Sequence, residues 1–147
     1  MSTEQNKAAV RRIFDEVINQ GNLDLADEML TSDYVYRSPG SPELHGPEGF
    51  KQLITMYRTA CPDVHLDIDE MLTDGDAVVT RWTGRGTQLG EFMGIAPTGK
   101  RVTVTGVIIT RFRGSKAAEE WELMDMLGLL EQLGAIPSSE QAVAAAR

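Results

Sequence analysis

Residues 64–83 read VHLDIDEMLTDGDAVVTRWT, and the pattern in this stretch decides the fold. Apolar Val64, Leu66 and Ile68 alternate with polar residues, which is the two-residue period of a strand with one buried face. The Asp74-Gly75 pair is typical of a tight turn between antiparallel strands. The stretch therefore predicts a β-hairpin whose second strand covers residues 77–83.

Strand signals continue on the C-terminal side of this hairpin. Turn residues at 98–100 and 114–116 bound a long predicted strand at 101–113, and a last strand is predicted at 118–127. A brief strand is also expected upstream, at residues 34–36. The C-terminal half of the chain therefore predicts an antiparallel sheet.

Helix signals lie on the N-terminal side. Ser2 and Gln5 form a capping-box pattern, after which apolar residues repeat at helical spacing up to Gly21. A short helix is predicted at 25–30, and Gly46-Pro47 opens a third helix that ends before Pro62. Helices followed by antiparallel strands predict an α+β domain, in which the helices cover one face of a curved sheet. We expect a single domain at 1–135 and an Ala-rich tail at 136–147.

Composition excludes several classes of protein. The 147 residues carry 22 acidic and 14 basic side chains, a formal charge of −8, which disfavours binding to nucleic acid and to anionic lipids. Cys61 is the single cysteine, so a disulfide framework and multi-cysteine metal motifs are excluded. No apolar run approaches the roughly 20 residues that span a bilayer, and the polar start lacks the hydrophobic segment of a signal peptide. We therefore expect a cytoplasmic protein.

A metal site is not predicted either. Four side chains that could hold a hard metal occupy alternate positions of one strand, Asp63, His65, Asp67 and Asp69. The opposite face of that strand is apolar, which favours reading the charged set as its solvated side.

Several motifs together resemble one protein family. They are RWTGRGT at 81–87, GEFMG at 90–94, PTGK at 97–100, EWELMD at 120–125, GLLEQLG at 128–134 and GPEGF at 46–50. In this order, over about residues 5 to 135, the chain resembles the SnoaL-like polyketide cyclases. The resemblance implies a cone-shaped α+β barrel of the nuclear-transport-factor-two-like kind, usually homodimeric, with an apolar pocket between sheet and helices.

The resemblance also implies a chemistry. It is a cofactor-free intramolecular aldol ring closure on a polyketide methyl ester, in which one aspartate acts as acid and base, and that aspartate matches Asp125. Relatives often carry histidine where this chain has Arg37 and Gln88. Neither an arginine nor an amide serves as a general base near pH 7, so these departures leave open a different substrate or a loss of the cyclase chemistry.

Alternation within the last predicted strand provides a second argument for a catalytic role of Asp125. It places Trp121, Leu123, Asp125 and Leu127 on one face, and we expect that apolar face to point inward. Burial would raise the pKa of the Asp125 carboxyl toward neutrality, as a catalytic acid or base requires. The opposing interpretation is that Asp125 pairs with an arginine or caps the turn at 128–134.

The remaining predicted site residues are substrate-binding. Alternation places Ile109 and Arg111 on one face of the preceding strand, where Arg111 would either pair with Asp125 or bind an enolate or ester oxygen. Aromatic rings suit a flat ligand, although each could equally be core. The predicted substrate-binding set is Arg111, Trp82, Trp121, Ile109, Tyr36, Arg37 and Tyr57.

The leading hypothesis is a cofactor-independent cyclase acting on a hydrophobic or aromatic small molecule. One alternative is a non-catalytic binding protein of the same fold. An epoxide hydrolase is less favoured, because Ile109 and Arg113 flank Arg111 where a second aspartate is required. A ketosteroid-isomerase-like enzyme is the remaining alternative, of which only fragments are visible.

Overall fold

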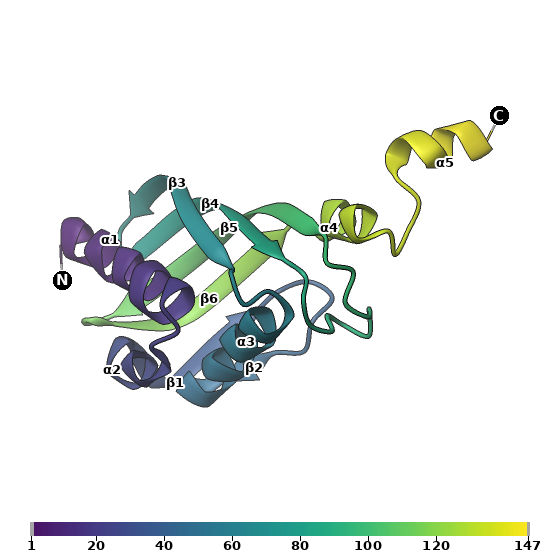
Figure 1. Cartoon of the computed structure of the whole chain (residues 1–147). Helices are drawn as coiled ribbons and strands as arrows, with labels where there is room; N and C mark the ends of the chain where they lie inside the picture. Colours follow the sequence, from purple (N-terminus) through teal and green to yellow (C-terminus); the bar gives the residue numbers. More distant parts are fainter. Residues whose placement is uncertain (1, 147) are drawn as a thin grey trace.

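Six strands form one curved sheet in the computed structural model, which describes residues 2–146 (Figure 1). The strands are β1 (Leu30–Arg37), β2 (Leu44–His45), β3 (His65–Asp74), β4 (Ala77–Thr87), β5 (Arg101–Arg113) and β6 (Lys116–Met124). Their order across the sheet is β2-β1-β6-β5-β4-β3. The sheet therefore curves without closing, and β2 and β3 are its edges.

The helices lie mainly on one side of this sheet (Figure 1). Helix α1 (Thr3–Arg12) begins at the predicted Ser2–Gln5 capping box and continues as π-helical turns, η1 (Ile13–Asn19). A short helical stretch follows, consisting of η2 (Leu23–Leu25) and α2 (Ala26–Met29). Helix α3 (Gly46–Ala60) has Pro47 in its first turn, as predicted. Helices α4 (Met126–Leu133) and α5 (Ser139–Ala145) follow the last strand, and α5 lies apart from the sheet.

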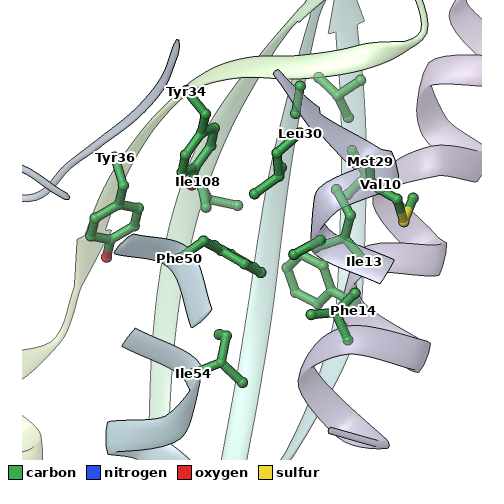
Figure 2. Close-up of a cluster of buried hydrophobic side chains, with 14 of the residues drawn as sticks. Val10, Ile13, Phe14, Met29, Leu30, Tyr34, Tyr36, Phe50, Ile54 and Ile108 are labelled. Atoms are coloured by element: carbon green, nitrogen blue, oxygen red, sulfur yellow. The ribbon is translucent and has the colours of Figure 1, made fainter. Parts of the chain in front are cut away.

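The core forms where these helices meet the inner face of the sheet. Figure 2 shows Val10, Ile13 and Phe14 from the N-terminal helix packed near Phe50 and Ile54 of α3, with Tyr34 and Tyr36 of β1 beside them. Tyr34 packs edge-on against Phe50, with ring centroids 5.9 Å apart. The apolar stripes of α1 and α3 are therefore buried against the same sheet face.

The predicted α+β architecture is confirmed, and so is the hairpin that suggested it. Asp74 pairs with Ala77 across a two-residue turn in which Gly75 has φ 59°, a conformation that glycine adopts without strain. The predicted strand at 101–113 coincides with β5. The prediction of a wholly antiparallel sheet was wrong at one pair, because β1 runs parallel to β6.

The inward face predicted for the last strand was also wrong. Strand β6 ends at Met124 instead of residue 127, and Glu120 and Glu122 are among its buried side chains. Trp121 is 40% exposed and Leu123 is 52% exposed on the opposite face. The alternation was correct but its direction was reversed, because Trp121 and Leu123 lie on the outer face while the carboxyl groups of Glu120 and Glu122 point inward.

Within residues 2–146, the structure contains no helix with both the length and the apolar character needed to cross a membrane.

Candidate active site

An apolar pocket lies between the inner face of the sheet and the helices. Residues of η1, α3, α4 and strands β1, β3, β4, β5 and β6 line it. Its aromatic lining consists of Phe14, Tyr36, Phe50, Tyr57, Trp82 and Phe92. Two carboxyl groups, those of Glu120 and Glu122, reach the same pocket. A pocket with predominantly apolar walls and a few convergent polar groups is the usual form of a small-molecule site.

Glu122 is held in this pocket by two donors from neighbouring strands. The Tyr36 hydroxyl donates to its Oε1 at 2.6 Å, and Nε1 of Trp82 donates to its Oε2 at 3.1 Å. Both donors are buried, Tyr36 at 2% and Trp82 at 4% exposure. The carboxyl plane of Glu122 is therefore fixed on both oxygens.

The environment of Glu122 prepares it for proton transfer. Burial disfavours its charged form and raises the pKa of the carboxyl to about 7, helped by the neighbouring Glu120 and opposed by the hydrogen bonds from Tyr36 and Trp82. Burial and the adjacent carboxylate raise the pKa of Tyr36 far above its ordinary value, so its hydroxyl stays protonated. A carboxyl with a pKa near the working pH is suited to acting as both base and acid.

Glu120 occupies a deeper position on the same face of β6. It accepts hydrogen bonds from the Tyr34 hydroxyl at 2.6 Å and the Thr110 hydroxyl at 2.7 Å. Burial raises its pKa, which these two hydrogen bonds oppose. Each of the two carboxyl groups thus accepts two hydrogen bonds from the protein, and Glu122, at 7% exposure against 2% for Glu120, is the more accessible to a ligand.

Gln88, one of the two departures from the resembled family pattern, has a structural role in this chain. Gln88 is 1% exposed, and its Nε2 donates to the carbonyls of Ile95 and Ala96 at 3.1 and 3.3 Å. Its Oε1 accepts from the amide and the hydroxyl of Thr98 at 3.1 and 2.7 Å. Gln88 therefore fastens the loop between β4 and β5, which carries Phe92 into the pocket.

Three of the predicted site residues meet in the pocket, namely Tyr36, Tyr57 and Trp82. Tyr36 and Trp82 contact Glu122 directly. The indole lies over the backbone of β5, where a Cβ on Gly106 would stand 2.4 Å from the Trp82 ring. Glycine at 106 thus leaves the space that this orientation of the indole needs.

The other predicted substrate-binding residues lie elsewhere. Arg111 is an exposed neighbour of Asp76 and pairs across the sheet with Glu119, not with a residue near Asp125. Arg37 makes an ion pair with Glu119 at 3.1 Å and another with Glu43. Ile109 and Trp121 are cross-strand partners on the outer face. None of these four residues lines the pocket, because Ile109, Arg111 and Trp121 lie on the outer face of the sheet and Arg37 lies at the end of β1. Their substrate-binding roles stay predictions.

Asp125 is exposed and serves as the N-cap of α4. Its Oδ1 accepts a hydrogen bond from the amide of Gly128 at 2.9 Å, and it does not line the pocket. This placement matches the capping interpretation of its pattern. The catalytic role implied for Asp125 by the resemblance stays a prediction, which activity measurements must test.

Sequence reasoning missed Glu122, although a signal was present. Buried glutamates are rare, so the apolar face of the last strand was predicted to point inward, which left Glu120 and Glu122 on the outer face. Tyr34 and Tyr36 occupy alternate positions of β1 in the same way, and this tyrosine pair matches the glutamate pair across the parallel β1–β6 contact. Donors and acceptors repeating with the same period on two strands indicate buried partners.

No group of three or more histidine, cysteine, aspartate or glutamate side chains within the described residues is placed to hold a metal ion.

Comparisons with known proteins agree on one family. A family model described as SnoaL-like polyketide cyclase matches residues 8–133. The chain is 30% identical over 130 residues to the aklanonic acid methyl ester cyclase DnrD of Streptomyces peucetius, covering 85% of this chain and 88% of that protein. It is 28% identical over 118 residues to the nogalonic acid methyl ester cyclase of Streptomyces nogalater, covering 79% of this chain and 88% of the relative.

Solved structures share the fold of this chain. TsrD from Streptomyces laurentii superposes with a TM-score of 0.83 at 29% identity, over 92% of this chain and 99% of its own. AclR from Streptomyces galilaeus, a proposed hydroxylase, superposes with a TM-score of 0.84 at 30% identity, over 99% and 90%.

Proposed function

The chain belongs to the SnoaL-like polyketide cyclase family, and we propose from this membership that it closes a carbon ring in a polyketide ester by aldol condensation, without a cofactor. The observation that supports the reaction best is Glu122, a buried carboxyl with a pKa of about 7 in an apolar pocket. Relatives named for methyl ester cyclases suggest the substrate class, a polyketide methyl ester.

Glu122 carries both proton transfers in this proposal. Its carboxylate removes a proton from a carbon that neighbouring carbonyls have acidified, and the resulting enolate carbon attacks a second carbonyl carbon of the same molecule. A carbon–carbon bond forms and the attacked oxygen becomes an alkoxide. The proton held by Glu122 then passes to that alkoxide, so the product is an isomer of the substrate.

The residues around Glu122 orient its carboxyl group for these proton transfers. Tyr36 and Trp82 orient the carboxyl through its two oxygens, and the Tyr36 hydroxyl offers hydrogen-bond stabilisation when the carboxylate is charged. The apolar walls exclude water, which strengthens these interactions and protects the enolate. A positioned acid–base group typically contributes about 10² to 10⁴ to the rate.

We also propose a cytoplasmic homodimer whose functional unit is residues 1–135. The outer face of the sheet supports the dimer, because Val107, Trp121 and Leu123 form an exposed apolar patch on β5 and β6. The free thiol of Cys61 suits a reducing compartment.

The test of the function is turnover of two ester substrates, aklanonic and nogalonic acid methyl esters, by wild type, Glu122→Gln and Asp125→Asn. We expect wild type to give a product of unchanged mass. Glu122→Gln should lower kcat at least 100-fold, because an amide cannot accept the proton. Asp125→Asn should stay within about threefold of wild type, because asparagine caps a helix as well as aspartate.

Each contrary result has a distinct meaning. Loss of activity in Asp125→Asn with full activity in Glu122→Gln would assign the acid–base role to Asp125. A product heavier by one oxygen atom would show that the reaction is a hydroxylation and not a cyclisation. Esters that raise the melting temperature of wild type without being converted would favour the binding-protein alternative.

A further inference from the structure

Tyr57 places a hydroxyl group in the pocket that the acid–base site does not use. The residue lies in the last turns of α3, opposite the sheet, and lines the same pocket as Glu122. Its ring stacks against Phe92 of the β4–β5 loop, with centroids 6.2 Å apart and planes 28° apart. Helix packing on one side and the loop on the other therefore fix the direction of the hydroxyl.

This hydroxyl lacks a strong acceptor. Within residues 2–146 its one hydrogen bond goes to the thioether sulfur of Met124 at 3.7 Å, and a thioether is a weak acceptor. The hydroxyls of Tyr34 and Tyr36, in contrast, each donate to a carboxyl oxygen at 2.6 Å. The Tyr57 side chain is partly buried and lines the pocket, and a tyrosine hydroxyl in such surroundings normally finds an oxygen or nitrogen partner. The Tyr57 hydroxyl is therefore available to donate a hydrogen bond to a ligand.

The position of Met124 shows where that donor points. Met124 follows Glu122 by two residues on the inner face of β6, a spacing of roughly 7 Å along a strand. A carbonyl group of a ligand lying between the two positions would have Glu122 on one side and the Tyr57 hydroxyl on the other. Such a ligand oxygen would replace the sulfur as the acceptor.

We propose that Tyr57 is a second catalytic residue, whose hydroxyl donates a hydrogen bond to the carbonyl oxygen that becomes the alkoxide. This inference rests on the proposed function. Tyr57 keeps its own proton throughout and stabilises the negative charge as the carbon–carbon bond forms, while Glu122 supplies the proton that neutralises the alkoxide. This role differs from the stacking on a flat substrate that the sequence suggested for Tyr57, because the Tyr57 ring already packs on Phe92.

The electrostatics of Tyr57 agree with a donor that stays protonated. Burial, and secondarily the nearby Glu122, raise the pKa of the Tyr57 hydroxyl above its ordinary value. At neutral pH the group is therefore a neutral O–H that can meet developing negative charge.

The test compares Tyr57→Phe with Tyr34→Phe, because each removes a single tyrosine hydroxyl and keeps the ring. Tyr34 does not line the pocket, and its hydroxyl supports Glu120. For Tyr57→Phe we expect kcat on an aklanonic acid-type methyl ester to fall about 10- to 100-fold, with KM within about threefold and an unchanged melting temperature. For Tyr34→Phe we expect kcat within about threefold of wild type and a melting temperature lower by several degrees, because Glu120 loses a donor.

A second measurement tests the donor without turnover. The ester is bound to Glu122→Gln, and the infrared carbonyl stretch of the bound ligand is compared with that in Glu122→Gln/Tyr57→Phe. A carbonyl band at lower frequency in the first complex, lost in the second, supports the hydrogen bond even if wild type converts nothing. Equal bands, or kcat of Tyr57→Phe within twofold of an active wild type, would overturn the role of Tyr57 and leave the proposed function standing. Absence of ester binding to every form would overturn both.

Discussion

Among single residues, buried Glu122 makes the stability of the protein depend on pH. Its carboxyl has a pKa of about 7 when folded, against a reference value of 4.5. Between these values the folded chain retains a proton that the unfolded chain releases, so stability falls as pH rises. The contribution of the protonated Glu122 carboxyl to the free energy of unfolding is fully present below about pH 4.5. It is lost as the pH rises through about 7.

Replacing Glu122 with glutamine should remove this dependence. Glutamine resembles the protonated carboxyl, since its oxygen can accept from Trp82 and its amide can donate to Tyr36. The shift corresponds to about 3 kcal/mol, so at pH 8 we expect Glu122→Gln to melt higher than wild type by roughly 6 to 12 °C. Near pH 5 the two melting temperatures should converge in calorimetry. A difference that is equal at pH 5 and pH 8 would contradict the burial of a titrating Glu122.

Among the elements, α4 depends on Asp125 for its beginning. The Asp125 side chain accepts from the Gly128 amide, and its own amide donates to the carbonyl of Thr105 at 2.9 Å. The cap therefore ties the start of α4 to β5.

Capping chemistry predicts different outcomes for two substitutions at Asp125. Asp125→Ala should lower the free energy of unfolding by about 1 kcal/mol, whereas Asp125→Asn should change it by only a few tenths. Urea denaturation followed by circular dichroism measures both values. An alanine variant as stable as wild type would mean that the cap contributes nothing.

For the whole molecule, the outer face of the sheet predicts self-association. Cross-strand pairs place Leu72 beside Val79, Val79 beside Ile109 and Ile109 beside Trp121, so that an apolar row crosses four strands. Ion pairs border it, including the pairs of Arg81 with Asp69 and Glu70. An apolar centre with a charged rim is the usual composition of a protein–protein interface.

A charge placed in this patch should separate the proposed dimer. We expect wild type to sediment as a dimer at micromolar concentration and Leu123→Glu to sediment as a monomer. The dissociation constant of the dimer should rise at least 100-fold in this variant. Leu89→Glu is the matched control, because Leu89 is 60% exposed on the β4–β5 loop. A monomeric wild type, or equal dissociation of both variants, would rule out this face.

The sequence by itself determined the elements and their class. Strand alternation at 64–83, the Asp74-Gly75 turn, the capping box at Ser2 and the helix opening at Pro47 are local signals, and each depends on backbone geometry within a few residues. The motifs at 81–100 and 120–134 likewise sufficed for the family, since their order along the chain carries that information. Tyr36, Tyr57 and Trp82 were predicted as site residues from the affinity of aromatic rings for a flat ligand.

Only the tertiary structure decided which face of β6 points inward. Alternation assigns residues to two faces but does not say which face meets the core, and a direction chosen by hydrophobicity sent Trp121 inward and Glu122 outward. The direction follows from partners far along the chain, since Tyr36 and Trp82 supply the hydrogen bonds that make a buried carboxyl at 122 tolerable. The apolar residues on the outer face are likewise explained by a partner outside the local sequence, because the surface of a second molecule can cover them. The candidate acid–base residue is therefore set by long-range pairing between strands, which no local pattern contains.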